Sequence, residues 1–368
     1  MGVVNSYLSL TKPKVVILLQ ITALCSVLSH DLIGESEINM ETIKTIFIVF
    51  VGGYLTAGGA NAVNMWYDRD IDPIMTRTSN RPLSTGKIEA HAALLFGILM
   101  AISGTIWFSL LANNVAAFWA FFSILFYVFI YTMWLKRKTP QNIVIGGIAG
   151  STPPIIGWAA AEEGLSIQIT SFEVFFDSIF NLGPHEYLGP YPLMPWFMFI
   201  LIFLWTPPHF WALALYRSKE YEKVGVPMMP NVRGKSRTLV EMKIYSILLI
   251  ILSTITFFSY TPSIDWEIFN NVNQESFIVS FTTTVLSVWY ATTVWNIDVF
   301  EEVDESGRMS IASRSFFVSL IYLALMFIVL VTGSLGFEGS LIGIFIVLAC
   351  IYILETKSKK SYLEVYNT

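Results

Sequence analysis

Acidic and amide side chains recur at helical spacing where the second long apolar stretch of the chain ends. Asn64, Asp68 and Asp72 are four residues apart, and Asn61 lies three residues before Asn64. On a helix these side chains share one face, because residues three and four apart lie above one another. Oxygen ligands grouped in this way suit Mg²⁺, which prefers a few carboxylates together with water and a substrate phosphate. The spacing therefore indicates a magnesium and phosphate site.

Two arginines follow this motif at the same spacing. Arg77 and Arg81 are four residues apart, and their forked guanidinium donors match phosphate or carboxylate oxygens. Asp70 leaves the shared face, so we expect it to be solvated or paired with Arg69. The alternative for the whole motif is an ordinary solvated helix end, where aspartate and arginine are common. We favour a functional site, because ionised side chains at membrane depth are costly and usually have a function.

The composition shows which kind of element must position these residues. Hydrophobic residues make up 54% of the 368-residue chain and charged residues only 13%, whereas soluble domains carry roughly 25% charged residues. The 28 Phe, 16 Tyr and 11 Trp suit lipid-facing and interfacial positions. These values exclude a soluble globular protein, a disordered chain and a coiled coil. Cys25 and Cys350 both lie inside apolar stretches, which excludes a disulfide scaffold and a cysteine-based metal site.

Stretches long enough to cross a bilayer recur along the chain. A transmembrane helix needs about 20 mostly apolar residues, and this length predicts an all-α integral membrane protein. Ten stretches qualify, at 15–34, 44–66, 91–111, 115–135, 142–161, 194–215, 242–261, 277–297, 315–333 and 338–354.

The basic residues give the expected orientation, since cytoplasmic segments are rich in lysine and arginine. With ten spans, one face carries 21 basic and 14 acidic residues, and the other carries Lys44 with 13 acidic residues. We therefore predict a cytoplasmic N-terminus, and the tenth span places the basic C-terminal tail there as well. The first apolar stretch lacks a cleavage site and the N-terminus lacks the character of a mitochondrial presequence. We expect a multi-pass protein of the bacterial inner (plasma) membrane.

The segment 164–193 is an unusually long loop on the predicted outer face. Its apolar residues Phe172, Phe175, Phe176, Ile179 and Phe180 fall at helical spacing. This spacing predicts an amphipathic helix that lies on the membrane surface. Residues 183–195 are rich in glycine and proline and return the chain to the sixth span.

The motif at 61–83 resembles the first aspartate-rich motif of the UbiA-type intramembrane prenyltransferases, which reads Asn-x3-Asp-x3-Asp followed by Arg-x3-Arg-Pro-Leu. Other segments, over about residues 8–333, resemble the protohaem IX farnesyltransferase (haem O synthase) branch of that family. They are Asp68–Asp72, Tyr131–Arg137, Gly146–Gly150, Pro153–Trp158, Trp205–Leu215 and Lys219–Pro230. The second acidic motif of the family usually has aspartate where this chain has Glu220, which is a conservative change for a metal ligand.

The resemblance implies a bundle of nine core transmembrane helices with a central cavity that opens near the cytoplasmic face. Residues 1–333 would form this single prenyltransferase domain, and residues 334–368 would add a tenth helix and a basic cytoplasmic tail. The implied activity is a Mg²⁺-dependent transfer of prenyl groups.

The resemblance also assigns roles to the candidate residues. A metal would be held by Asn64, Asp68, Asp72 and Glu220, with Asn61 beside them. Tyr131 would hydrogen-bond to the diphosphate or stabilise an allylic cation through its ring face. The basic residues that would hold diphosphate or haem propionates are Arg77, Arg81, Lys136, Arg137 and Lys219. Each of them could instead be only a basic anchor of the topology, and we rank the two arginines of the motif above the pair at 136–137.

His209 follows Pro207 and Pro208, a pair that interrupts helical hydrogen bonding inside the sixth span. Because the resembled branch acts on haem, His209 is a candidate axial ligand of the haem iron. The alternative is a core histidine whose hydrogen bonds are satisfied within the protein. Gly146 and Gly150 would admit either a flat macrocycle or a closely packed helix.

The function implied by the resemblance is transfer of farnesyl from farnesyl diphosphate to a vinyl group of haem B, with addition of water. The products would be haem O, for terminal-oxidase haem biosynthesis, and diphosphate. Expected partners are the two substrates, membrane lipid and a haem A synthase or terminal-oxidase assembly factors, with no nucleic acid. A prenyltransferase for a quinone precursor or chlorophyllide is the nearest alternative. A cation-coupled transporter is another class, although transport favours acidic residues near the midplane on broken helices.

Overall fold

The computed structural model describes residues 2–34, 37–183, 192–260, 274–300 and 309–366, and within them all side chains except those of 218–220 and 357–366. Every regular element in these ranges is a helix. In chain order they are α1 (Val3–Leu10), α2 (Pro13–Gly34), α3 (Met40–Tyr67), η1 (Asp68–Asp70), α4 (Ala90–Leu111), α5 (Asn114–Leu125), η2 (Phe126–Leu135), α6 (Asn142–Ser151), α7 (Pro153–Ala161), α8 (Phe172–Phe180), α9 (Leu193–Tyr216), α10 (Ser218–Lys223), α11 (Met229–Thr254), η3 (Thr256–Tyr260), α12 (Gln274–Trp295), α13 (Ser310–Gly333) and α14 (Gly336–Tyr366).

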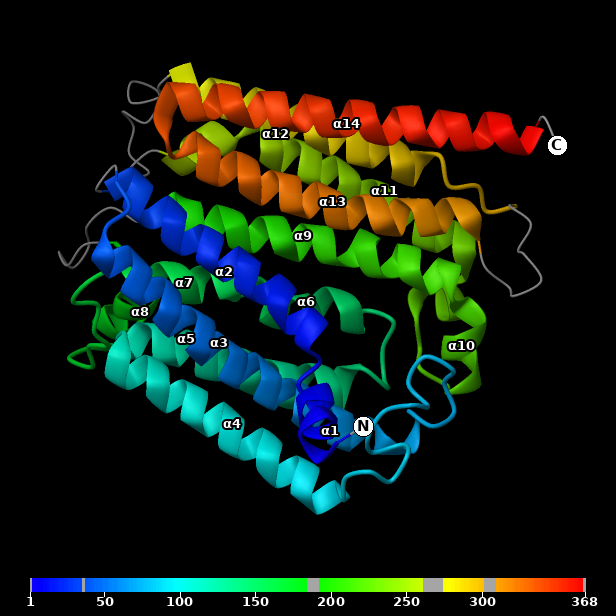
Figure 1. Cartoon of the computed structure of the whole chain (residues 1–368), viewed down its shortest axis with the longest axis horizontal. Coiled ribbons are helices and arrows are strands. Elements are labelled where there is room, and N and C mark those ends of the chain that lie inside the picture. Colours follow the sequence, from blue (N-terminus) through cyan, green and yellow to red (C-terminus); the bar gives the residue numbers. More distant parts are fainter. Residues whose placement is uncertain (1, 35–36, 184–191, 261–273, 301–308, 367–368) are drawn as a thin grey trace.

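Nine spans within the described ranges are long and apolar enough to cross a membrane, which confirms the predicted all-α integral membrane class. They correspond to nine of the ten predicted spans. The remaining prediction, 242–261, falls on the second half of α11 and on η3. α11 is more polar than the others because it carries Arg237, Glu241 and Lys243. α11 nevertheless packs along α9 and α12 as one helix of the bundle (Figure 1).

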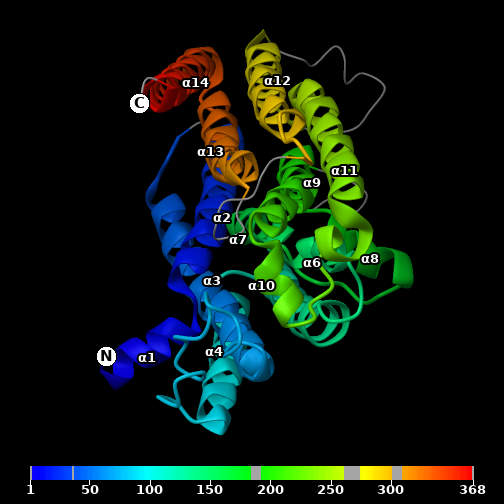
Figure 2. The ribbon, with the colours of Figure 1, turned by 90° about the vertical axis from the view of Figure 1, so that its right-hand side faces the viewer.

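The long helices run back and forth along one axis (Figure 1). α1, the segment 71–89, α10 and the C-terminal end of α14 lie at one end of the bundle, on the right in Figure 1, and α8 lies at the other. We call these the motif end and the α8 end. Figure 2, a view onto the motif end, shows α11 to α14 on one side and α3 with α4 on the other, with α2, α7 and α9 between them.

The helix predicted in the long loop is present as α8. Ser171 caps it by accepting a hydrogen bond of 3.2 Å from the backbone N–H of Val174. Phe172, Phe176 and Phe180 are exposed along one side of it, whereas Asp177 and Ser178 are buried together with Ile179, so the helix is amphipathic. Residues 184–191 of the same loop lie outside the described part of the chain.

Small residues allow the helices around α3 to approach closely. A Cβ atom on Gly59 would lie 2.6 Å from the backbone nitrogen of Ala101 and 2.7 Å from the carbonyl oxygen of Gly97, both in α4. Gly157 of α7 packs in the same way on the backbone carbonyl of Ala23 in α2. Such contacts are typical of membrane helices, whose association depends on close packing. The first contact holds α3, and the motif at its end, against α4, and the second holds α7 against α2.

α14 packs against α12 and α13. Near the motif end, an Arg314 Nη2 donates to both carboxylate oxygens of Glu355, at 2.9 and 3.0 Å. Trp289 Nε1 donates to the same carboxylate at 3.0 Å. The division into a 1–333 domain and a 334–368 addition stays a prediction.

Candidate active site

The motif predicted on α3 continues through the C-terminal end of this helix. Asn61 and Asn64 lie in its last turns and Asp68 is its C-cap. The backbone N–H of Asp72 donates to the carbonyl of Asp68 at 2.9 Å, so the helical spacing is kept beyond the cap. All four side chains are buried, and the two aspartates expose only 1% and 3% of their surfaces. The four residues therefore share one buried face, as their spacing predicts.

The two asparagines connect α3 to neighbouring segments. Asn61 donates from Nδ2 to the backbone carbonyl at the C-cap of α1, at 3.2 Å, and accepts from the Tyr127 hydroxyl at 3.3 Å. Asn64 accepts at Oδ1 from Lys12 Nζ, at 2.6 Å, and donates from Nδ2 to Thr132 Oγ1, at 3.0 Å. Their amide groups thus bring the start of α2 and the helix η2 against the motif.

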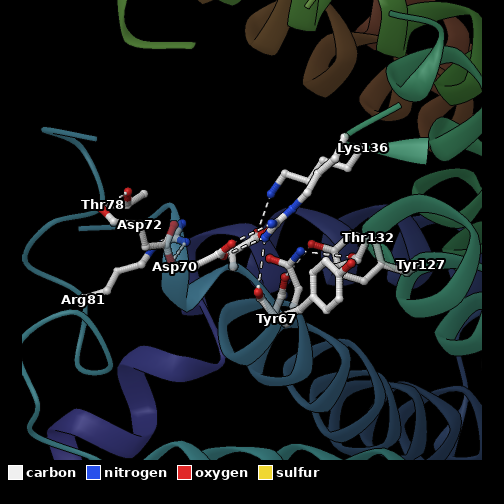
Figure 3. A network of polar contacts seen from close by, with 12 residues as sticks. Tyr67, Asp70, Asp72, Thr78, Arg81, Tyr127, Thr132 and Lys136 are labelled. Atoms are coloured by element: carbon white, nitrogen blue, oxygen red, sulfur yellow. Dashed lines mark hydrogen bonds and ion pairs between the residues drawn. The ribbon is translucent and has the colours of Figure 1, made fainter. Parts of the chain in front are cut away.

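The two buried aspartates of the motif each pair with a basic side chain. Figure 3 shows Asp72 with Arg81, and Lys136 of the other pair. Lys136 Nζ donates to Asp68 Oδ2, and Arg137 Nη2 lies 3.6 Å from Asp68 Oδ1. Arg81 Nη1 donates to Asp72 Oδ2 at 2.6 Å. Asp68 Oδ1 is buried and makes no hydrogen bond with any residue that the structure describes. A bound cation would satisfy this oxygen.

A π-helix delivers the residues that face α3 from the fourth span. In η2 the backbone N–H of Lys136 donates to the carbonyl of Tyr131, five residues earlier, at 2.9 Å. π-helical turns are rare and frequently occur at functional sites. The Tyr131 ring stacks on Tyr127, with centroids 5.4 Å apart. It also lies so close to Gly146 of α6 that a Cβ atom at this glycine would overlap it.

Lys12 is a site residue that the sequence reasoning missed. It stands between α1 and α2 with a φ of 52°, which is uncommon for a residue other than glycine. Burial holds the pKa of its ammonium group well below the usual range, and the charges of Arg81 and Lys136 lower this pKa further. In the sequence Lys12 is only a basic residue before an apolar stretch, which is typical of a topology anchor.

The predicted partner of Asp70 is wrong. Asp70 pairs with Arg137 through two hydrogen bonds of 2.7 and 2.8 Å, not with Arg69. Arg69 folds back along α3, where it donates to the Trp66 carbonyl at 2.8 Å and lies 4.8 Å from the centre of the Trp66 ring. The planar guanidinium of Arg137 donates to both carboxylate oxygens of Asp70 at once. Arg69, the neighbour of Asp70 in the chain, makes no such contact. Arg77 is exposed and makes no ion pair with a described residue.

His209 lies seven residues before the end of α9 and faces α13. Its Nδ1 is 2.6 Å from Ser319 Oγ. Because the Ser319 hydroxyl donates to the Phe316 carbonyl, Nδ1 must carry the proton, and Nε2 is the nitrogen available to another partner. The imidazole is stacked between the Trp205 and Phe316 rings, with centroids 4.2 and 4.7 Å away. This arrangement fits a core histidine and an oriented metal ligand equally well.

The donors for a metal come from the end of α3 and the turn that follows it, as far as the structure describes them. Lys219 and Glu220 belong to α10 at the motif end (Figure 1), but their side chains are outside the described set. Among described residues, no three His, Cys, Asp or Glu side chains form a group that could hold a metal. Asp68 and Asp72, together with the amide oxygen of Asn64, remain as a donor set. Two carboxylates and an amide fit Mg²⁺, which keeps several waters or phosphate oxygens as its other ligands.

Basic groups outnumber acidic ones on the buried face. Asp68 and Asp72 are accompanied by Lys12, Lys136 and Arg81, while Arg137 is compensated by the exposed Asp70. With Lys12 protonated, one positive charge is in excess at a place where solvent is largely absent. Such a site attracts an anion.

These observations define an all-α membrane protein with a buried cluster of acidic and basic side chains at one end of its helix bundle. The sequence profile of the UbiA prenyltransferase family matches residues 36–269. The chain belongs to this family.

Relatives in sequence agree with this assignment to the family. The chain is 36% identical over 325 residues to a protein of Bartonella henselae named protoheme IX farnesyltransferase, and the match covers 88% of each chain. It is 42% identical over 250 residues to the protein of that name from Symbiobacterium thermophilum, covering 67% of this chain and 72% of the relative.

Two solved structures are similar in fold. A structure of digeranylgeranylglyceryl phosphate synthase superposes with a TM-score of 0.63 and 16% identity, covering 92% of this chain and 100% of the other. A UbiA homologue from Archaeoglobus fulgidus bound to DMAPP and Mg²⁺ superposes with a TM-score of 0.54 and 15% identity, covering 89% and 99%. The shared fold agrees with the assignment to the family.

Proposed function

We propose that this protein transfers farnesyl from farnesyl diphosphate to a vinyl group of haem B, with addition of water, and releases haem O and diphosphate. Relatives at 36% and 42% identity are named protoheme IX farnesyltransferase, which supports haem as the acceptor. The observation that carries the prenyl diphosphate half of the proposal is the buried face of Asn64, Asp68 and Asp72, with three basic side chains against it.

The site has the groups that departure of diphosphate requires. Ionisation of an allylic diphosphate places negative charge on the leaving group, and fixed positive groups in a dry site stabilise it. Asn64, Asp68 and Asp72 would hold Mg²⁺, which supplies charge neutralisation to the diphosphate when bound. Lys136 donates to Asp68 and Arg81 donates to Asp72. Both basic side chains would also donate to diphosphate oxygens.

The charges of the site match this ligand. With Lys12 protonated, the buried face has one positive charge in excess, and Mg²⁺ together with a fully ionised prenyl diphosphate brings one negative charge. Binding would therefore leave the face neutral, which reduces the cost of keeping charged groups away from water. The stacked rings of Tyr127 and Tyr131 lie beside this face and would stabilise the allylic cation through their π systems.

For the acceptor, we propose that His209 ligates the haem iron through Nε2. Its Nδ1 proton is donated to Ser319, which is the arrangement that fixes the tautomer and the orientation of metal-bound histidines. The exposed Arg77 remains available for a propionate or for diphosphate. Lys219 and Glu220, on α10 at the same end, would complete the basic and acidic sets.

We further propose that the motif end faces the bacterial cytoplasm. The uneven division of lysine and arginine between the two ends supports this orientation. The expected partners, a haem A synthase or terminal-oxidase assembly factors, would then meet the protein within the same membrane.

The proposal is tested with the purified full chain in lipid nanodiscs, supplied with farnesyl diphosphate, haem B and Mg²⁺. Diphosphate release and a haem product heavier by one farnesyl and one hydroxyl group are expected, and a chelator should stop both. Diphosphate release with an aromatic acid or chlorophyllide, but not with haem, would favour the alternative acceptors. Absence of diphosphate release with every acceptor would contradict prenyl transfer and favour a transporter.

A further inference from the structure

A polar cavity lies beside α11. Its volume is about 530 Å³, and it is lined by Gln141, Met229, Arg233, Arg237 and Glu241. None of these residues belongs to the candidate active site. Gln141 follows the fourth span and the other four residues lie on α11, so the cavity opens at the motif end.

Two arginines approach this cavity from either side of a kink. α11 departs from helical geometry at Gly234, where φ is 81° and ψ is 162°, so Arg233 precedes the kink and Arg237 follows it. Arg237 donates to Glu241 at 2.6 Å and stays 59% exposed. Arg233 is exposed and has no ion pair with a described residue. The two guanidinium groups and the single carboxylate of Glu241 give the cavity a net positive charge. Guanidinium groups match the geometry of phosphate oxygens, so the cavity suits a phosphate group.

The cavity lies at the depth expected for lipid headgroups. Trp295, at the end of α12, donates from Nε1 to Ser246 Oγ of α11 at 3.3 Å. The Lys243 ammonium lies 5.0 Å from the centre of the Trp295 ring. Tryptophan and lysine at helix ends are typical of the membrane–water interface. Arg237 precedes Lys243 by six residues, which places it about 9 Å further toward the motif end.

An exposed apolar stripe continues from the cavity along α11 toward the α8 end. Val240, Ile244, Ile247 and Ile251 expose 43–53% of their surfaces. Ile244 and Ile251 lie seven and fourteen residues after Arg237, hence on the same face of the helix. The stripe and the arginines are therefore continuous, with the apolar part inside the membrane and the basic part at its surface.

We propose that the Arg233–Arg237 cavity binds the headgroup phosphate of an anionic phospholipid whose acyl chains lie along the α11 stripe. Basic pockets beside transmembrane helices recognise anionic headgroups by charge, while exposed apolar side chains accept the chains. This site is distinct from the prenyl diphosphate site and does not depend on the proposed function.

The test is native mass spectrometry of the full chain in detergent, with phosphatidylglycerol and phosphatidylcholine of identical acyl chains. The unmodified protein should retain phosphatidylglycerol in preference. Arg233→Gln/Arg237→Gln should reduce this preference by about thirtyfold, since each basic residue near an anionic lipid contributes about fivefold. Arg69→Gln/Lys87→Gln removes the same charge from exposed residues at the same end and should keep the preference.

Other outcomes separate the lipid from other anions. Equal retention of phosphatidylglycerol by the unmodified protein and by Arg233→Gln/Arg237→Gln would overturn the proposal. So would displacement of the bound lipid by millimolar inorganic phosphate, which would show an anion site without lipid specificity. A weaker haem titration of the double variant with unchanged lipid retention would assign the cavity to haem propionates instead. A second variant, Ile244→Gln, should weaken retention of long-chain phosphatidylglycerol more than that of the dihexanoyl form, and equal weakening would exclude the stripe.

Discussion

Asp68 combines burial with an oxygen that no described residue hydrogen-bonds. Asp68→Asn keeps the shape of the side chain and removes the charge that would hold Mg²⁺. We expect kcat for diphosphate release to fall by about a hundredfold or more, as when a group that stabilises transition-state charge is lost. Asp70→Asn is the control, because Asp70 is exposed and off the shared face, and its effect should be mild. Near-normal activity of an inserted Asp68→Asn protein would contradict the site.

Lys12 provides a second test, with a matched neighbour. Lys12→Met should raise KM for prenyl diphosphate by about tenfold to a hundredfold, because it removes a charge-assisted hydrogen bond from a buried site. Lys14→Met removes the same charge two residues later, where the side chain is exposed, and should leave KM unchanged. Equal effects of the two variants on steady-state kinetics would show that Lys12 acts only through net charge.

His209 separates a haem ligand from a core histidine. If Nε2 ligates the iron, His209→Ala should weaken haem binding and shift the Soret band, while prenyl diphosphate still binds. Ser319→Ala, which removes the partner of Nδ1, should produce a smaller shift in the same spectrum. If the spectrum of correctly folded His209→Ala is unchanged, the ligand assignment is refuted and a quinone-type acceptor gains support.

At this scale the sequence predicts contacts within one helix better than contacts between segments. Asn61, Asn64 and Asp68 share a face because helical geometry alone places them there. The pairing of Asp70 with Arg137 depends on where another span ends, and no spacing rule contains that information. Lys12 became recognisable only when the fold placed its ammonium on Asn64.

At the scale of elements, α6 and η2 pack closely because Gly146 has no side chain where it meets the Tyr131 ring. Gly146→Ala should displace the Tyr131 ring and lower stability by about 1–3 kcal/mol, the usual cost of overpacking. Gly150→Ala is the matched control, because a Cβ atom there meets nothing within 4 Å, and both variants gain the same helix propensity. The difference between the two melting temperatures isolates the clash, and equal melting temperatures would show that the ring moves aside freely.

The spans were predictable because apolar length is a property of the sequence itself. The span predicted at 242–261 differs from the helix in the structure, because α11 begins earlier, at Met229, and carries charged side chains within the helix. Nothing in the sequence distinguishes the π-helical turns of η2 from α-helical ones, since they differ in hydrogen bonding rather than in composition.

At the scale of the whole molecule, the ten predicted crossings place both ends of the chain on one side. A reporter fused after Thr368 should be active only in the cytoplasm, and one inserted after Ile169, an exposed residue at the α8 end, only outside. The reason is the excess of basic residues at the motif end. A reporter after Thr368 that is active outside would remove one crossing.

The π-helix η2 makes the site depend on the number of residues in a segment as well as on their kind. Deletion of a single residue between Phe126 and Leu135 would let the backbone close into α-helical bonds and change the length of the span by about one residue rise. The contact of Lys136 with Asp68 would then be altered, although the segment would be as apolar as before and would still cross the bilayer. The length of this span is therefore under a constraint that hydropathy cannot reveal.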